Sequence, residues 1–347
     1  MNKKYLKSIL FCIFFLIVTA AYTGNAEASV YGDFQYSVSG KNVTITKYLG
    51  NSSKVIIPGT IKGKKVKTIG KGAFKWCTTI KRVEVTGNVK TIEKDAFSYC
   101  HNLEKVILRK GINIIGKNAF SYCTKLKQIS LNKGITSIGS GAFKGCKKIE
   151  KVVIPSGTEK IGGSAFAYCY KLKSISLPAS VTSIGAEAFY YCKSLKSIKL
   201  PSKLNKISES SFWKCKSLTT VNIPKSVVKI DDYAFENCTS LKKINIPGSV
   251  KSIGTCAFWN CKKMVSVTIH SGTTTIKTAA FVNCKSLSSI KIPASVIRMD
   301  SHSVGYNYNK SKNEWKYVHS SKVTIYGRKD SEAEKYAEKN KIKFEKW

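Results

Sequence analysis

The amino-acid sequence predicts an α/β-type repeat solenoid that is capped at both ends and exported from the cell. Three observations support this prediction. A phenylalanine and a cysteine recur every 23 residues, the apolar residues around them keep one pattern, and the first residues have the form of an export signal. A unit of this length cannot bury its apolar side chains alone, so stacked units must share one core.

The amino-terminal segment has the three parts of a secretory signal. Three lysines lie within the first seven residues, the run from Ile9 to Val18 is apolar, and Ala26 to Ala28 has the small-x-small pattern of a cleavage site. The apolar run is shorter than the ~20 residues of a membrane-spanning helix. We therefore expect cleavage after Ala28 and a secreted mature chain without a transmembrane segment. An uncut amino-terminal anchor helix is the alternative.

The repeat keeps one length over ten units, because nine steps of 23 residues separate the first phased cysteine from the last. The cysteines are Cys77, Cys100, Cys123, Cys146, Cys169, Cys192, Cys215, Cys238, Cys261 and Cys284. The phenylalanines, three residues earlier, are Phe74, Phe97, Phe120, Phe143, Phe166, Phe189, Phe212, Phe235, Phe258 and Phe281. We predict that both sets form the structural core inside one continuous stack.

One unit, residues 172–194, reads LKSISLPASVTSIGAEAFYYCKS. The segment LKSISL predicts a short strand with alternate side chains inward, and the following proline ends it because proline has no N–H to pair. Val181 and Ile184 form a second apolar pair. The spacing within Ala188 to Cys192 suits one face of a single helical turn. At ~4.8 Å per coil, eleven or twelve coils would form a rod roughly 55 Å long.

These residues resemble the BspA-like class of leucine-rich repeats, known from bacterial surface proteins. The pattern L-x-x-I-x-L-P-x-S-V-x-x-I-G-x-x-A-F-x-x-C returns ten times in phase. The resemblance implies a leucine-rich-repeat right-handed superhelix, with a parallel β-sheet on one face and short helical turns on the other. It also implies adhesion, or binding of proteins and glycans at cell surfaces, without specifying a ligand.

The repeat and the resemblance divide the chain into five parts. We expect a signal peptide over residues 1–28, an N-terminal β cap over 29–65, the solenoid of about ten repeats over 66–299, a loop insertion over 300–322, and a C-terminal strand–helix–strand cap over 323–347. Caps are also expected physically, because the ends of a solenoid expose its core. Ser331 and Glu334 have the spacing of a capping box for the last helix.

Evenly spaced cysteines in an exported protein raise the question of disulfides. Equivalent positions in neighbouring coils lie ~4.8 Å apart, within disulfide range, but their side chains point the same way and pairing would break the repeat. We therefore expect free, buried thiols that act as small hydrophobic groups. Cys256 stands outside the phase at a slot that we expect to be exposed. It is either a tolerated surface substitution or a reactive thiol that can bridge to another molecule.

The sequence contains no catalytic motif, so we expect no enzyme, no cofactor and no metal site. No serine lies in a nucleophile elbow, the carboxylates are dispersed, there is no phosphate loop, and one sulfur per coil makes a line rather than a tetrahedron. The remote alternative is a secreted hydrolase whose site lies in residues 301–321. It would use His302, His319 and Glu314.

The outward positions of the predicted strands form one candidate binding surface. Their side chains are small or basic, so an extended partner has room to lie along them, although solvated strand residues would look the same. The candidates are Lys151, Ser174, Ser176, Lys199, Asn222, Lys243, Asn245 and Lys291.

The residue before each phased cysteine forms a second candidate surface. It is aromatic in five coils, and Trp76 begins the row. Aromatic rings beside lysines can stack on sugar rings or bind cations, or they can simply cover the seams between coils. The candidates for partner binding are Tyr99, Tyr122, Tyr168 and Tyr191.

The charge of the chain points to acidic partners. Fifty-nine basic residues against twenty acidic ones give a net charge of +39, and only four of the basic residues are arginines. Lysine is a flexible, hydrated charge that favours diffuse attraction to polyanions over sequence readout. The leading expectation is a binding protein for cell-surface attachment or for recognition of an extracellular protein, glycan or anionic wall polymer. Non-specific binding of nucleic acid or wall polymer is the alternative. A further alternative is that the lysines only keep the protein soluble.

Overall fold

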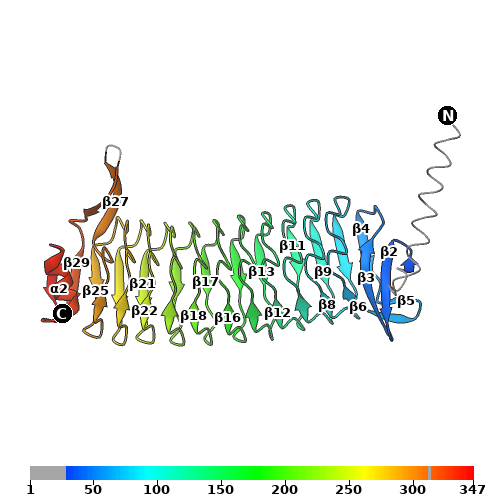
Figure 1. The fold of residues 1–347 in the computed structure, drawn as a ribbon, viewed down its shortest axis with the longest axis horizontal. Helices are drawn as coiled ribbons and strands as arrows, with labels where there is room; N and C mark the ends of the chain where they lie inside the picture. The colour runs from blue at the N-terminus through cyan, green and yellow to red at the C-terminus, as the bar shows by residue number, and fades with distance from the viewer. Residues whose placement is uncertain (1–28, 312–313) are drawn as a thin grey trace, which may run out of the picture.

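The computed structural model describes residues 29–311 and 314–347, so the predicted signal peptide and its cleavage site lie outside the described residues. The model confirms a leucine-rich-repeat solenoid of parallel strands. It is an elongated, slightly bent rod in which the described chain starts at one end and finishes at the other (Figure 1). It has about thirteen turns rather than eleven or twelve, because the carboxyl-terminal strands continue the stack.

Each coil contributes one long strand to a ladder that we call the strand face. The alternating LKSISL-type segments form these strands, and most pair in parallel with an equivalent strand 23 residues away, as Val152 does with Ile175. The strand pairing is interrupted in three places, after Ser130, Ser176 and Asn222. The long strands are β4 (Lys54–Ile57), β7 (Arg82–Val85), β9 (Lys105–Leu108), β11 (Gln128–Ser130), β13 (Lys151–Val153), β15 (Ser174–Ser176), β17 (Ser197–Lys199), β19 (Thr220–Asn222), β21 (Lys243–Ile246), β23 (Ser266–Ile269) and β25 (Ser289–Lys291).

A second parallel ladder, which the sequence did not predict as strand, runs along another side of the rod. The second apolar pair of each repeat ends in it, as Ile184 does in β16, paired with Ile161. The short strands are β6 (Lys64–Ile69), β8 (Thr91–Ile92), β10 (Ile114–Ile115), β12 (Ser137–Ile138), β14 (Lys160–Ile161), β16 (Ser183–Ile184), β18 (Lys206–Ile207), β20 (Lys229–Ile230), β22 (Ser252–Ile253), β24 (Thr275–Ile276) and β26 (Arg298–Met299).

The predicted helical turn is not confirmed. The segment before each phased cysteine is a run of hydrogen-bonded turns, and two of its residues have positive φ, such as Glu187 (58°) and Tyr191 (61°). Left-handed residues interrupt a right-handed helix. Alternate N–H groups bond instead to the next coil, as Phe189 N does to Ser211 O at 2.9 Å and Tyr191 N to Trp213 O at 2.8 Å. We call this side of the rod the turn face.

The two caps close the stack in different ways. At the amino-terminal end, β1 (Ser29–Tyr31), β2 (Phe34–Ser39) and β3 (Asn42–Tyr48) are antiparallel neighbours, and β3 pairs with β6, which also pairs with β5 (Thr60–Ile61). At the other end, β29 (Thr324–Gly327) and β30 (Lys343–Lys346) extend the long-strand ladder, with α2 (Glu332–Lys339) between them. Ser331 caps α2 by accepting from Glu334 N.

Residues 300–322, where the sequence predicted a loop insertion, contain a β-hairpin. Its strands are β27 (Tyr306–Ser311) and β28 (Glu314–His319), paired antiparallel. The hairpin projects sideways from the rod near its carboxyl-terminal end (Figure 1). Alternating tyrosine and asparagine in YNYN suits a strand, so the segment expected to be a loop forms a hairpin instead.

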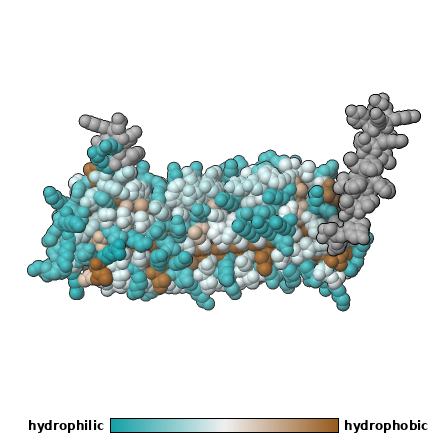
Figure 2. Space-filling model, viewed as in Figure 1, coloured by the Kyte–Doolittle hydropathy of each residue, from teal (hydrophilic) through white to brown (hydrophobic). Residues whose placement is uncertain are grey.

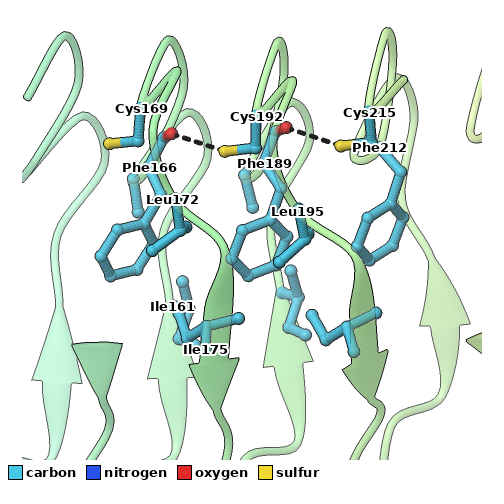
Figure 3. Close-up of a cluster of buried hydrophobic side chains, with 14 of the residues drawn as sticks. Ile161, Phe166, Cys169, Leu172, Ile175, Phe189, Cys192, Leu195, Phe212 and Cys215 are labelled. Atoms are coloured by element: carbon cyan, nitrogen blue, oxygen red, sulfur yellow. Dashed lines mark hydrogen bonds between the residues drawn. The ribbon is translucent and has the colours of Figure 1, made fainter. Parts of the chain in front are cut away.

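The core is one continuous column in which each phenylalanine stacks on the next. All ten phased phenylalanines are buried, with ring centroids 4.6–5.9 Å apart, and Tyr48 of the cap extends the column onto Phe74 at 5.0 Å. Nine of the ten phased cysteines are buried, and Cys77 in the first coil is half-buried. Each buried thiol donates a hydrogen bond to the phenylalanine carbonyl of the preceding coil, as Cys192 does to Phe166 O at 3.2 Å (Figure 3).

Candidate binding surfaces

The strand face presents the first set of sequence-predicted candidates to solvent. Lys151, Ser174, Ser176, Lys199, Asn222, Lys243, Asn245 and Lys291 are all exposed. The parallel register places them in two rows, one through the first outward position of each strand and one through the second, as the pairings of Lys199 with Asn222 and of Lys243 with Ser266 show. Both rows run along the axis of the rod.

Surface hollows follow these rows. A hollow of about 620 Å³ extends from Ser176 to Ser226, and another of about 670 Å³ extends from Asn222 to His270. The two share Asn222, Pro224 and Lys225, so they form one groove across five successive coils. A third hollow of about 720 Å³ lies further toward the amino terminus, between Lys105 and Ser156. We call the two adjoining hollows the strand groove.

The loops after the long strands build one wall of the groove. Each begins at a position held by proline in several repeats, including Pro201, Pro224 and Pro247, which cannot continue the ladder. The groove is basic, since Lys199 and Lys225 line it and Lys243 lies beside it, in the row of first outward positions. The carboxylates near the third hollow are instead paired with lysines, as Glu150 is with Lys173 at 2.7 Å.

The turn face carries the aromatic candidates as two separate groups. Trp76, Tyr99 and Tyr122 stack with ring centroids 4.0 and 5.0 Å apart. Gly145 occupies the next coil, and a Cβ there would lie 2.7 Å from Cδ1 of Tyr122, so this ring covers the glycine. The row resumes with Tyr168, which stacks on Tyr191 at 5.6 Å. The interruption divides one predicted row into two clusters.

The second cluster contains aromatic residues that the sequence analysis missed. Tyr190 and Trp213 stack at 4.5 Å with an interplanar angle of 8°, and Tyr170 contacts both Tyr168 and Tyr191 edge-on. Tyr190 and Trp213 lie one residue before the slot that precedes the cysteine, and Tyr170 lies two residues after it. A comparison of these nearby slots between coils would have found them. All five side chains are partly exposed.

Of the proposed hydrolase residues, His302 and His319 meet at the base of the hairpin, whereas Glu314 lies at its far end, opposite Ser311. His302 stacks on Tyr317 at 3.9 Å, and His319 contacts Tyr306 at 4.6 Å. Burial lowers the pKa of His302, and the neighbouring His319 adds to this effect. Glu314 pairs with Lys316 at 2.8 Å. Over the described ranges, no group of three His, Cys, Asp or Glu side chains is placed to hold a metal ion.

The cysteine thiols lie in surroundings that oppose their ionisation. Burial raises the pKa of the Cys169 and Cys284 thiols to about 12. Cys256, at the slot that we expected to be exposed, is half-buried, and burial raises the pKa of its thiol to about 12 as well. The cysteines that the structure describes form no disulfides. A thiol with a raised pKa is a poor nucleophile at neutral pH.

No described helix has both the length and the apolar composition that crossing a bilayer requires. The visible side of the rod is mostly hydrophilic, with a narrow hydrophobic line along part of its length (Figure 2).

Comparisons with known proteins identify the repeat. The model of the BspA type leucine rich repeat region matches in six copies, over residues 44–173, 159–288 and 211–313. The structure is similar to that of a leucine-rich repeat protein from Bacteroides ovatus, with a TM-score of 0.67 and 25% identity over 92% of this chain and 99% of that one. It is also similar to a leucine rich cell surface protein from Faecalibacterium prausnitzii, with a TM-score of 0.57 and 25% identity over 80% of this chain and 95% of that one. No curated protein matches the sequence.

Proposed function

Because the chain belongs to the BspA-type leucine-rich repeat family, we propose that it is a secreted binding protein that attaches to cell surfaces through an extended anionic partner. The strand groove is the surface that takes this partner. The partner's chemistry is that of an anionic wall polymer or an acidic surface glycan or protein segment, lying parallel to the rod. One of the similar structures is described as a cell surface protein, which agrees with this location.

The continuity of the groove carries the proposal. Two hollows join at Asn222, Pro224 and Lys225 and cross five coils, which at ~4.8 Å per coil gives a track roughly 20 Å long. The outward strand residues along it are serine, threonine, asparagine and lysine. A long polymer can therefore lie along the groove without meeting a large side chain, and successive coils present it with similar contacts.

Charge supports an anionic occupant. From Asn237 to Met299 the chain has eight lysines, one arginine and no acidic residue, and the whole chain carries +39. Such a surface raises the local concentration of a polyanion and its rate of association. Lysines give little geometric selectivity, so the shape of the groove, rather than the total charge, has to provide preference for an extended chain.

Lysine substitutions test whether the groove or the total charge binds the partner. We expect Lys199→Gln, Lys225→Gln and Lys243→Gln together to weaken binding to purified polyglycerol-phosphate wall polymer by at least tenfold, measured by sedimentation or anisotropy at about 150 mM salt. The matched control replaces Lys90, Lys117 and Lys160, which are exposed on or beside the short strands. The control should change affinity by less than about threefold.

Equal weakening by the two triple variants would contradict binding in the strand groove. It would indicate diffuse attraction to the total charge of the protein. Unrelated DNA sequences serve as the comparison ligand, because binding through counterion release alone would treat them like the wall polymer. On cells that export the protein, a wash with about 1 M salt should release it, since the Debye length falls to ~3 Å. Retention through that wash would contradict attachment by charge.

A further inference from the structure

Five aromatic residues on the turn face form a compact cluster that we call the aromatic shelf: Tyr168, Tyr170, Tyr190, Tyr191 and Trp213. It consists of two stacked pairs, Tyr168 on Tyr191 and Tyr190 on Trp213, and of Tyr170, which contacts the first pair edge-on. The pairs meet at steep angles, with Tyr191 and Trp213 at 61° and centroids 5.2 Å apart. The rings therefore support one another, and each of them is partly exposed to solvent.

Neighbouring residues hold this arrangement in place. Burial raises the pKa of the Glu236 carboxyl, and hydrogen bonds from Trp213 and Asn237 oppose the rise, so the indole N–H has a fixed partner. Burial and the nearby Tyr168 phenol raise the pKa of Tyr190 to about 12. A rigid aromatic surface loses little conformational entropy when a ligand binds to it.

Three lysines surround the shelf. Lys214 Nζ lies 4.1 Å from the Trp213 centroid and donates a hydrogen bond to Tyr191 Oη at 3.1 Å. Lys193 Nζ lies 5.0 Å from the Tyr191 centroid, and Lys144 Nζ lies 5.8 Å from that of Tyr168. Among the residues that the structure describes, none of the three lysines forms a salt bridge, although Lys214 lies near enough to the Glu236 carboxyl to oppose the rise in its pKa. Lys193 and Lys214 thus place two ammonium groups over Tyr191, with the Glu236 carboxyl near one of them.

Near the carboxyl-terminal end of the turn face, a tryptophan in the equivalent slot is covered by the hairpin. Trp259 occupies the slot of Trp213 two coils further along, and the hairpin places Tyr308 and Tyr317 against it, at 5.5 and 6.3 Å between centroids. The hairpin thus supplies planar groups to Trp259 from within the chain. No segment of the described chain does this for Trp213, whose ring contacts are those within the shelf.

We propose that the aromatic shelf is a second binding site, specific for an acidic saccharide. A sugar ring packs against the exposed parts of the tyrosine and tryptophan rings, the phenols hydrogen-bond to its hydroxyl groups, and its carboxylate reaches Lys193 and Lys214. Mutual stacking occupies one face of each paired ring and leaves little room for a run of stacked nucleic-acid bases. The phenols and ammonium groups instead match the hydroxyl groups and the carboxylate of an acidic saccharide. The site lies on a different side of the rod from the strand groove and does not depend on it.

A fluorescent oligosaccharide of alternating glucuronate and N-acetylglucosamine tests the proposal by anisotropy at about 150 mM salt. We expect binding to weaken at least tenfold in the double variant Lys193→Gln, Lys214→Gln, and at least fivefold in Trp213→Leu. The matched controls are Lys262→Gln with Lys285→Gln, which share the slot of Lys193 in distant coils, and Trp76→Leu in the other aromatic cluster. The controls should change affinity by less than twofold.

Two further ligands make the outcome decisive. An uncharged N-acetylglucosamine oligomer should bind at least tenfold more weakly than the acidic one, because it cannot engage the lysines. Equal losses in shelf and control variants, no binding of the acidic probe, or equal binding of an oligo-deoxythymidine that depends on the same residues would each overturn the proposal. Substitutions in the strand groove should leave the losses caused by the shelf variants unchanged, so the two sites can fail separately.

Discussion

The phenylalanine column inside the rod and the aromatic row outside it are built from neighbouring slots of the same repeat, yet they behave differently. The inner slot holds phenylalanine in all ten phased units, and every ring is buried. The outer slot changes from tryptophan to tyrosine, glycine, lysine and asparagine along the chain. The inner slot must fill a fixed space between two identical neighbours. Packing does not fix the residue in the outer slot, so differences in this slot between coils can indicate a surface specialised for binding.

The largest expected effect comes from breaking the inner column. Phe189→Ala should lower the free energy of unfolding by about 3–5 kcal/mol, because it removes a fully buried ring between Phe166 and Phe212 and leaves a cavity. Chemical denaturation followed by tryptophan fluorescence measures this loss. In the outer row of the same coil, Tyr191→Ala should cost about 1 kcal/mol or less, as surface substitutions usually do. Comparable losses at the two sites would contradict the distinction between them.

The buried thiols give the next largest effect, and it depends on pH. The pKa of Cys169 is raised from 9.0 to about 12 by burial, so the unfolded chain releases this proton at lower pH than the folded chain. The stabilisation is therefore complete below about pH 9 and is lost as the pH rises from about 9 to about 12, at roughly 1.4 kcal/mol per pH unit for one proton.

The substitution Cys169→Ala isolates this contribution from the other groups that titrate in the same range. Between pH 8 and pH 10.5, the unfolding free energy of the natural chain should fall by about 2 kcal/mol more than that of Cys169→Ala. At pH 8 the substitution should itself cost about 1 kcal/mol, because it removes the hydrogen bond to Phe143 O. Identical pH dependence in the two proteins would show that the thiol is not buried as described.

The sequence predicted the inside of the molecule better than its outside. Strict 23-residue spacing places equivalent side chains in register, so the stacking of the solenoid followed from the repeat alone. The two-residue short strands did not, because a strand such as Ser183–Ile184 is too short to show alternation. The hairpin at Tyr306 was missed since it occurs once and has no repeat to reveal it.

Only some of the candidate binding residues on the turn face could be predicted from the sequence. Reading the single slot before the cysteine identified Tyr168 and Tyr191 but not Tyr190 or Trp213, because contacts between coils join neighbouring slots. The helical turn was expected from the spacing of Ala188, Phe189 and Cys192. That spacing fits a helix and a chain of turns equally well, and the glycines at equivalent slots elsewhere were the available signal for left-handed backbone.

The smallest of the three expected effects concerns outer slots whose side chains vary while their backbone does not. Ser210 has φ of 51°, and the equivalent residues Gly72 and Gly141 both have φ of 64°. Ser210→Val should lower the free energy of unfolding by about 1–2 kcal/mol, because a β-branched side chain is strained in the left-handed region. Ser210→Gly is the matched control and should leave stability within about 0.5 kcal/mol or raise it.

If valine were tolerated as well as glycine in thermal or chemical unfolding, the backbone of this turn would be less constrained than its hydrogen bond from Ser210 N to Asp232 O at 3.1 Å indicates. A loss with valine alone would show that these outer slots accept only side chains that suit a left-handed residue, which explains why none of the described residues with positive φ is valine, isoleucine or threonine.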